Sequence, residues 1–183
     1  MRRLFLFNMV TLDGFFAGPK GELDWHNVDK EFNEFAVEQL REIETLVFGR
    51  VTYELMAGYW PTPTALKNDP VVAEKMNGLA KLVFSRTLRG VEWSNSRLVK
   101  GDPVAEISKL KSQQGKALAI FGSANLAAGL QEAGAIDELR IMVNPVILGS
   151  GKPLFRNGNS RLPLKLAGSR AFRSGNVLLT YIR

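Results

Sequence analysis

The sequence predicts an α/β protein, a three-layer α/β/α arrangement around a mixed, mostly parallel central sheet. Short apolar runs, typical of buried strands, alternate with stretches in which apolar residues recur at helical spacing. Two of these runs end in a glycine that opens a helix-like stretch, at Gly49 and Gly122. Near the C-terminus, apolar segments flank Ser174 and Gly175, which predicts an antiparallel hairpin at one edge. Because no linker-like composition separates two cores, residues 1–183 are expected to form one domain.

The strand assignments follow the apolar runs. Stretches rich in Leu, Ile, Val and Phe predict strands at residues 3–10, 45–48, 81–84, 97–100, 117–121 and 138–143. The C-terminal hairpin is expected to pair residues 162–172 with residues 176–182. Loops are expected at residues 11–24, which are rich in glycine, and at residues 59–70, which are rich in proline and threonine.

The helix assignments follow periodicity and capping residues, at residues 29–43, 51–56, 71–79, 103–111 and 124–133. In the first of these, apolar side chains recur on one face, and Asp29 has the residue type and position of an N-cap. Pro103 stands at a first helical turn, where proline is tolerated. Gly134 follows the last helix as a C-terminal cap.

The composition excludes several classes of function. The chain has no cysteine, which excludes disulfides, thiolate metal sites and cysteine nucleophiles, and its single histidine, His26, excludes a histidine-rich zinc site. No apolar run is long enough to span a membrane, and Asn8 interrupts the apolar N-terminal segment, which therefore reads as a core strand rather than a signal peptide. A reducing cytoplasm fits this composition.

The charge balance favours a small anionic ligand over nucleic acid. The 24 basic and 18 acidic residues give a net charge of +6. The Lys and Arg residues are scattered, however, and aromatic residues are not interleaved with them as in a stacking platform for bases. We therefore expect a solvated basic surface and no nucleic-acid partner.

The two glycine corners predict a site for a phosphorylated ligand. A strand that feeds a helix N-terminus leaves backbone N–H groups pointing outward, at the positive end of the helix dipole. Two such ends in one small domain suit a dinucleotide. Arg50 and Arg86 offer matching positive charge.

The order of motifs resembles the dihydrofolate-reductase-like superfamily. The resemblance is closest to a stand-alone form of the C-terminal reductase domain of the riboflavin-biosynthesis deaminase-reductase, and it covers essentially the whole chain. It is carried by Thr11-Leu12-Asp13-Gly14, Leu23-Asp24-Trp25, Gly49-Arg50-Val51-Thr52-Tyr53-Glu54, Phe84-Ser85-Arg86, Phe121-Gly122-Ser123 and Asn144-Pro145-Val146-Ile147-Leu148-Gly149.

The resemblance implies NADPH as cofactor and a pteridine-like or ribosylaminouracil-type substrate. By position, the phosphates of the cofactor would lie against Gly49, Arg50, Val51 and Thr52. Its 2′-phosphate would lie near Ser85 and Arg86. Its pyrophosphate and nicotinamide side would contact Gly122, Ser123, Ala124, Asn125 and Leu126. The resemblance also implies a homodimer, through residues 130–148 or the last strands. Two positions depart from the family pattern, because Phe121 stands where a Glu is usual and Phe15 where a Lys or Arg is usual.

The candidate catalytic residues are Asp13, Asp29 and Tyr53. Either carboxylate would manage a proton or anchor the substrate, and the Tyr53 hydroxyl would bond to a ring. The alternatives are a turn residue for Asp13, a helix cap for Asp29 and a core aromatic for Tyr53. The residues expected along a flat heterocyclic substrate are Trp25, Phe32, Met56, Trp60 and Phe121.

The function predicted from these features is NADPH-dependent reduction of a small heterocycle. Reduction of 5-amino-6-(5-phosphoribosylamino)uracil is the first candidate reaction. Dihydrofolate reduction, another carbonyl or drug-like substrate, and a non-catalytic NADPH-binding protein of the same fold remain as alternatives.

Overall fold

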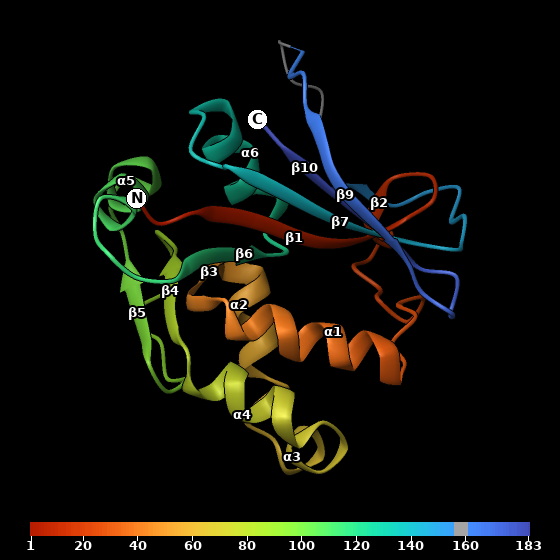
Figure 1. Cartoon of the computed structure of the whole chain (residues 1–183). Helices are drawn as coiled ribbons and strands as arrows, with labels where there is room; N and C mark the ends of the chain where they lie inside the picture. The colour runs from red at the N-terminus through yellow and green to blue at the C-terminus, as the bar shows by residue number, and fades with distance from the viewer. Residues whose placement is uncertain (156–160) are drawn as a thin grey trace.

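The structure is a computed structural model that describes residues 1–155 and 161–183. Its centre is an eight-stranded sheet in the order β5-β4-β3-β6-β1-β7-β10-β9, shown in Figure 1. The strands are β1 (Leu4–Thr11), β3 (Ile43–Gly49), β4 (Ala80–Phe84), β5 (Ser96–Val99), β6 (Ala117–Phe121), β7 (Glu138–Asn144), β9 (Lys165–Ala171) and β10 (Val177–Ile182). A separate two-stranded ribbon pairs β2 (Phe15–Ala17) with β8 (Lys152–Pro153).

The sheet is parallel from β5 to β7 and antiparallel at its C-terminal edge. β1 pairs in parallel with β6 and β7, while β10 runs antiparallel to both β7 and β9. All eight residues of β1 are buried, as expected for a central strand covered on both faces. The predicted fold class is thereby confirmed.

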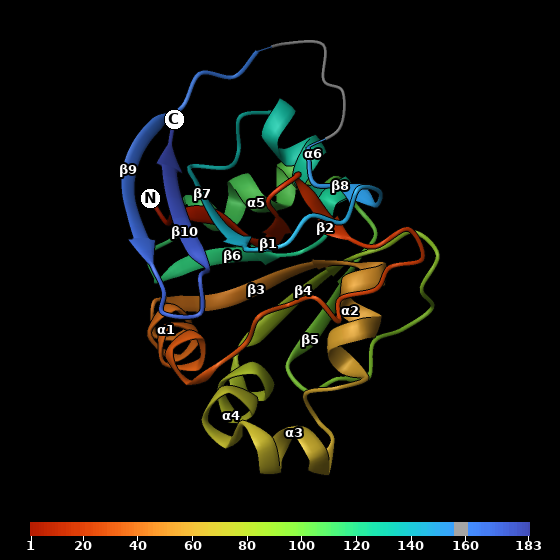
Figure 2. The ribbon, with the colours of Figure 1, turned by 90° about the vertical axis from the view of Figure 1, so that its right-hand side faces the viewer.

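Two layers of helices cover the sheet, as Figure 2 shows. On one face lie α1 (Lys30–Arg41), α2 (Arg50–Ala57), α3 (Pro63–Asn68) and α4 (Pro70–Gly78), and on the other lie α5 (Pro103–Lys111) and α6 (Ala124–Glu132). Alternate residues of β1 divide between the two cores: Phe5 and Phe7 pack in the first layer, and Leu4 and Leu6 in the second.

The region of residues 59–70 differs from its prediction as a loop, because it contains α3. Thr62 is the N-cap of this helix, and its side chain accepts a hydrogen bond from the Ala65 N–H. Pro63 occupies the first helical position, where its missing N–H costs nothing. Thr62 and Pro63, which were among the residues that indicated a loop, therefore begin a helix.

Candidate functional site

The two glycine corners lie side by side at the carboxyl edge of the sheet. β3 and β6 are neighbours, with Val47 opposite Ile120, so their following turns meet. The Ser123 hydroxyl accepts a hydrogen bond from the Gly49 N–H at 2.7 Å, and the Thr52 hydroxyl accepts one from the Ser123 N–H at 3.0 Å. We call this pair of hydrogen bonds the serine–threonine clasp. It joins the starts of α2 and α6 into one unit.

The clasp depends on an unusual backbone at residues 122 and 123. Gly122 has φ of +66°, and a Cβ placed there would lie 3.1 Å from the Thr52 side chain. Ser123 also adopts the left-handed conformation, with φ 55° and ψ 51°. This conformation strains a residue other than glycine, and such strain is often found at functional sites.

The helix N-termini at the clasp lack side-chain caps. The side chains of Asp29, Thr62 and Asp102 cap α1, α3 and α5. The N-caps of α2 and α6, Gly49 and Ser123, provide no such bond, and neither does that of α4, Asp69. Because the clasp uses the N–H groups of Gly49 and Ser123 themselves, the groups open to a ligand belong to the first turns that follow. Uncapped ends of this kind fit the phosphates of a dinucleotide.

The two arginines predicted to bind phosphate, Arg50 and Arg86, differ in their contacts. Arg50, in the first turn of α2, forms an ion pair with Glu54 at 2.9 Å, and Arg86 is exposed after β4. The Ser85 hydroxyl accepts hydrogen bonds from the N–H groups of Thr87 and Leu88. Ser85 thus shapes the turn that carries Arg86.

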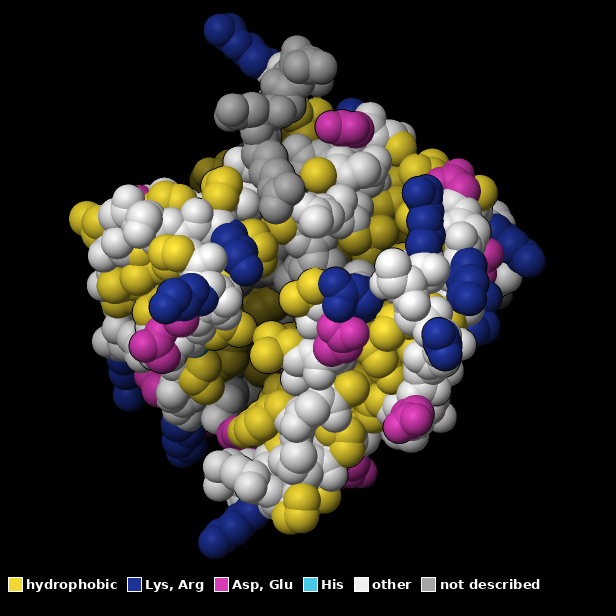
Figure 3. All heavy atoms as spheres, turned by 180° about the vertical axis from the view of Figure 1, so that it is seen from behind, with side chains coloured by type: hydrophobic (Ala, Val, Ile, Leu, Met, Phe, Trp, Pro, Cys, Tyr) yellow, Lys and Arg dark blue, Asp and Glu magenta, His cyan; other side chains and the backbone are white. Residues whose placement is uncertain are grey.

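Four predicted substrate residues pack on the core of the α1–α2 face, and we call them the apolar wall. Its members are half-buried side chains that pack on the core: Phe32, Met56, Trp60 and Phe121. In Figure 2, β3 ends toward the right, which is the side of the molecule that Figure 3 presents, and there the surface is hollowed, with mostly hydrophobic walls. Four of the five predicted substrate residues therefore pack against the same core cluster.

Trp25, the fifth predicted substrate residue, lies in the connection before α1. Its ring packs edge-on against His26 with centroids 4.5 Å apart, and its indole N–H donates to the Glu22 carbonyl. Burial lowers the pKa of His26 to about 4, because its ring has little solvent to stabilise a positive charge. His26 is therefore neutral at pH 7.

The two predicted catalytic carboxylates hold the backbone in place. Asp13 accepts hydrogen bonds from the Thr11 hydroxyl and from the N–H groups of Leu148 and Gly149, and the Thr11 bond above all lowers its pKa. It thus ties the loop after β1 to the loop after β7. Asp29 is the N-cap of α1 and accepts from the Phe32 N–H at 2.8 Å. Catalytic roles for both stay predictions.

Tyr53 ties α2 to the connection between β4 and β5. Its side chain is buried, and its hydroxyl oxygen accepts hydrogen bonds from the N–H groups of Glu92 and Trp93 at 3.0 and 3.1 Å. The ring packs near that of Trp93. These contacts give Tyr53 a structural role, and its catalytic role stays a prediction.

A network of asparagines that sequence reasoning missed fastens the connection before α1 that carries Trp25, which we call the Trp25 segment. The Asn27 N–H donates to the Asn144 side chain at 2.9 Å, its side-chain amide donates to the Ser174 carbonyl, and its own carbonyl accepts from Asn176. Asn144 and Asn176 are fully buried. No local pattern signals such a network, because Asn27 lies more than a hundred residues from both Asn144 and Asn176.

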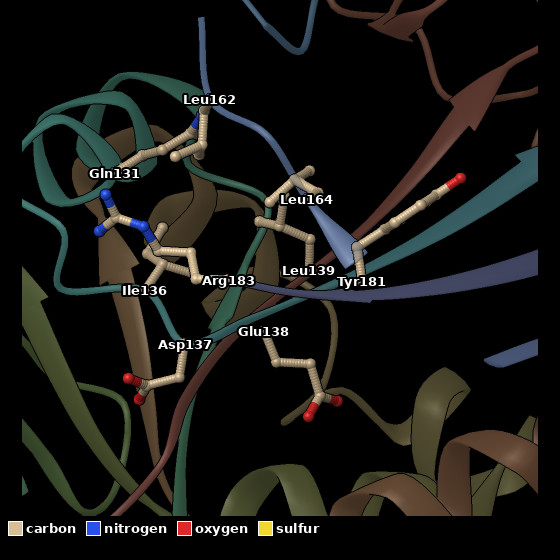
Figure 4. A pocket seen from close by; sticks show the side chains of 9 residues that line it. All are labelled: Gln131, Ile136, Asp137, Glu138, Leu139, Leu162, Leu164, Tyr181 and Arg183. Carbon is tan, nitrogen blue, oxygen red and sulfur yellow. The ribbon is translucent and has the colours of Figure 1, made fainter. Parts of the chain in front are cut away.

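A small pocket lies at the opposite end of the sheet. Figure 4 shows it beside the start of β7, and its volume is about 10 Å³. Its lining comprises Gln131, Ile136, Asp137, Glu138, Leu139, Leu162, Leu164, Tyr181 and Arg183. This space holds about one water molecule, which excludes it as a dinucleotide site.

Two features, a metal-binding group and a membrane-spanning helix, are not found among the described residues. Within residues 1–155 and 161–183, no group of three or more His, Asp or Glu side chains is placed to hold a metal ion. No helix in the same ranges combines the length and the apolar character that crossing a membrane requires.

The sheet order and the carboxyl-edge site define an α/β protein of the dihydrofolate-reductase-like class. Dihydrofolate reductase from Enterococcus faecalis, in complex with NADP(H), superposes with a TM-score of 0.62 over 99% of this chain and 96% of its own, at 18% identity. At that identity the likeness concerns the fold.

The chain belongs to the RibD C-terminal domain family, whose profile matches residues 2–178. The protein YyaP of Bacillus subtilis (strain 168) is 34% identical over 182 residues, which cover 98% of this chain and 94% of YyaP. A putative riboflavin biosynthesis protein from Shewanella sp. PV-4 has a TM-score of 0.76 at 26% identity, covering 99% of this chain and 98% of its own. The family resemblance inferred from the motifs is confirmed.

Proposed function

We propose that the protein is an NADPH-dependent reductase of a small heterocycle. The observation that carries the proposal is the pair of uncapped helix N-termini, α2 and α6, which the serine–threonine clasp locks together. Membership of a reductase-domain family supports the same reading.

The cofactor would lie along the carboxyl edge of the sheet. The first turns of α2 and α6 would bind its phosphates through backbone N–H groups, and Arg50 and Arg86 would supply positive charge. NADPH supplies the hydride when bound, so the protein contributes orientation and the exclusion of water. The apolar wall at Phe32, Met56, Trp60 and Phe121 would hold the substrate ring.

A thermal-shift comparison of cofactors tests the proposal. Saturating NADPH should raise the melting temperature, and it should do so more than an equal concentration of NADH, because a ligand that binds only the native state stabilises it. If both leave the melting curve unchanged, the proposal fails.

Arginine variants test the 2′-phosphate contact. Arg50→Ala and Arg86→Ala should each weaken NADPH binding by about tenfold or more and NADH binding much less, since a charge-assisted hydrogen bond is worth roughly 1.5–3 kcal/mol. Arg41→Ala, at the far end of α1, is the matched control. Equal losses for both cofactors would rule out the phosphate contact.

The first candidate substrate is 5-amino-6-(5-phosphoribosylamino)uracil, and dihydrofolate is the neighbouring one. NADPH oxidation measured against both compounds separates them. Tight NADPH binding without oxidation by any compound of a broad heterocycle panel would instead support a non-catalytic binding protein.

We also propose that the chain forms a homodimer through its last strands. β9 is an edge strand whose side chains are almost all exposed; Leu166 within it is 53% exposed, and Leu164 just before it is 38% exposed. An uncovered apolar edge of this kind favours a second copy as its partner.

We further propose that the protein resides in the cytoplasm, and the lack of cysteine supports this location.

A further inference from the structure

Asn8 is a buried asparagine beside the second glycine corner. It is the only polar residue between Leu4 and Val10, and it is 5% exposed. Its Nδ2 atom is buried, and no described residue accepts a hydrogen bond from it. Burying an amide donor without an acceptor costs free energy, and native proteins rarely do so. An acceptor on a bound ligand would remove this cost.

The direction of the Asn8 side chain follows from the regular pairing of β1. This strand pairs with β7 without a register shift, so successive side chains alternate between the two faces of the sheet. Leu6 and Val10, two positions to either side of Asn8, pack in the core that α6 covers. Asn8 therefore points into the same layer, where Ile141 of β7, which lies opposite it, is also buried.

Along β1, Asn8 lies at the level of the N-terminus of α6. Phe7 pairs with Phe121, the last residue of β6, and the Phe7 carbonyl accepts a hydrogen bond from the Gly122 N–H at 3.3 Å. Ala124, the first residue of α6, is buried in the layer into which Asn8 points. The Asn8 amide is thus directed toward the uncapped end of α6, where the proposed cofactor would bind.

The strand order indicates which part of the cofactor would reach Asn8. The residues proposed to bind the 2′-phosphate follow β4, and those proposed to bind the other phosphates follow β3 and β6. β1 is the next strand after β6 along the same edge. Because the 2′-phosphate marks the adenosine end of NADPH, the nicotinamide end would lie at β1.

We infer that Asn8 binds the nicotinamide of the cofactor, by donating a hydrogen bond from its side-chain amide to the carboxamide oxygen. The inference rests on the proposed function and adds a binding residue to it. This bond satisfies the buried Nδ2 donor. Phe7, the neighbour of Asn8 in β1, points to the opposite face of the sheet and packs against Phe121. A ring held by Asn8 therefore lies beside the apolar wall, to which Phe121 belongs.

Two ligands that differ in the nicotinamide test the inference. NADP⁺ and 2′-phospho-ADP-ribose share their phosphates and riboses, but only NADP⁺ carries nicotinamide, and each is titrated by calorimetry into the full chain. Asn8→Leu should weaken NADP⁺ binding about tenfold and leave the affinity for 2′-phospho-ADP-ribose within about twofold, because only the nicotinamide contact is lost. Asn8→Ala, which adds no volume, should give the same result. Equal losses for the two ligands, or no loss, would overturn the inference.

Thionicotinamide NADP⁺ tests whether the contact is made to the carboxamide oxygen. In this analogue a sulfur atom, which is a weaker hydrogen-bond acceptor, replaces that oxygen. The wild-type protein should prefer NADP⁺ over the analogue by about fivefold, whereas Asn8→Leu should bind the two about equally. The same preference in both proteins would rule out the contact.

The stability of the cofactor-free protein provides an independent readout. Leu has the branched shape of Asn without its polar atoms, so Asn8→Leu should raise the melting temperature by roughly 2–4 °C through removal of the buried donor. Asn144→Leu is the matched control, because the buried Asn144 amide donates to the carbonyls of Val10 and Met142, and it should lower the melting temperature. A fall in Asn8→Leu as large as that in Asn144→Leu would show that the Asn8 amide is already satisfied, and would overturn the inference.

The outcomes separate this inference from the proposed function. If the wild-type protein binds neither NADP⁺ nor 2′-phospho-ADP-ribose, the proposed function fails, and the inference fails with it. If the wild-type protein binds both ligands and the Asn8 variants lose both equally, only the inference fails.

Discussion

At the scale of single residues, Ser123 connects the two halves of the candidate site. Its hydroxyl accepts from the Gly49 N–H, its own N–H donates to Thr52, and its backbone is left-handed. Removing the hydroxyl leaves a backbone donor of the neighbouring turn without its partner.

We expect Ser123→Ala to lower the free energy of unfolding by about 1–2 kcal/mol, because one partly buried hydrogen bond is lost. NADPH binding should weaken by roughly tenfold, since a shift of about 1.4 kcal/mol changes an affinity by that factor. Denaturant unfolding and calorimetry measure the two effects. Ser108→Ala, an exposed serine on α5, is the control, and equal behaviour of both variants would refute a role for the clasp.

Lys81 shows an unusual buried amine. Its side chain is 1% exposed, and its ammonium donates to the carbonyls of Asn77, Leu79 and Ser94 at 3.0, 2.7 and 3.0 Å while lying 4.3 Å from the Trp93 ring centre. Burial lowers its pKa to about 8. The amine joins the end of α4 to the segment before β5.

The depressed pKa predicts a pH-dependent stability. Between pH 8 and about 10.5 the unfolded chain binds the Lys81 proton while the folded chain releases it, so the free energy of unfolding rises with pH in that window. The rise should reach up to ~3 kcal/mol at about 1.4 kcal/mol per pKa unit. Denaturant unfolding from pH 7 to pH 10.5 measures it. The Lys81→Met variant gives the pH dependence that comes from all other groups. If the difference in free energy of unfolding between the two proteins does not change with pH, the prediction is wrong.

At the scale of elements, the Trp25 segment is held by both packing and hydrogen bonds. Asn27 fastens it to the end of β7 and to the turn between β9 and β10. His26 is packed under Trp25 with its Nε2 atom buried and without a hydrogen-bond partner. Protonating that ring inside the protein therefore costs free energy.

Acid should release this segment. The pKa of His26 is about 4 in the folded protein and near 6.5 when the segment opens, so the open form binds more protons between these values and the closed form loses stability as pH falls from 6.5 to 4. Trp25 fluorescence, with Trp25→Phe as background, should therefore change over this range. His26→Gln should show no such transition; if it does, another group controls the segment.

At the scale of the whole molecule, the exposed edge at β9 predicts a concentration-dependent dimer. Leu166 lies opposite Tyr181 of β10, which lies opposite Leu139 of β7, so these side chains share one face of the sheet. Sedimentation velocity should detect the dimer, and Leu166→Lys should weaken it at least tenfold. Leu55→Lys, on α2 and equally exposed at 52%, should not. Dimerisation of Leu166→Lys at the wild-type concentration would exclude this edge.

Local patterns predicted most of the regular elements. β1, β6 and β7 were expected from their apolar runs, and the cap assigned to Asp29 agrees with its hydrogen bond to the Phe32 N–H. The short ribbon of β2 and β8 was missed, because strands of three and two residues carry no periodicity. The helix α3 was missed because Thr62 and Pro63 signal both loops and helix starts.

The sequence by itself determined the alternation of strands and helices, the absence of cysteine chemistry and the positions of both glycine corners, because these depend on residue type and short spacing. Only the tertiary structure decided that β3 lies beside β6, which brings Gly49 to Ser123 across 74 positions in the chain. The tertiary structure also decided that the Tyr53 hydroxyl bonds to the connection before β5 and that Asn27 bonds to Asn144. Contacts of this range follow from the order of strands in the sheet, which local propensity does not encode.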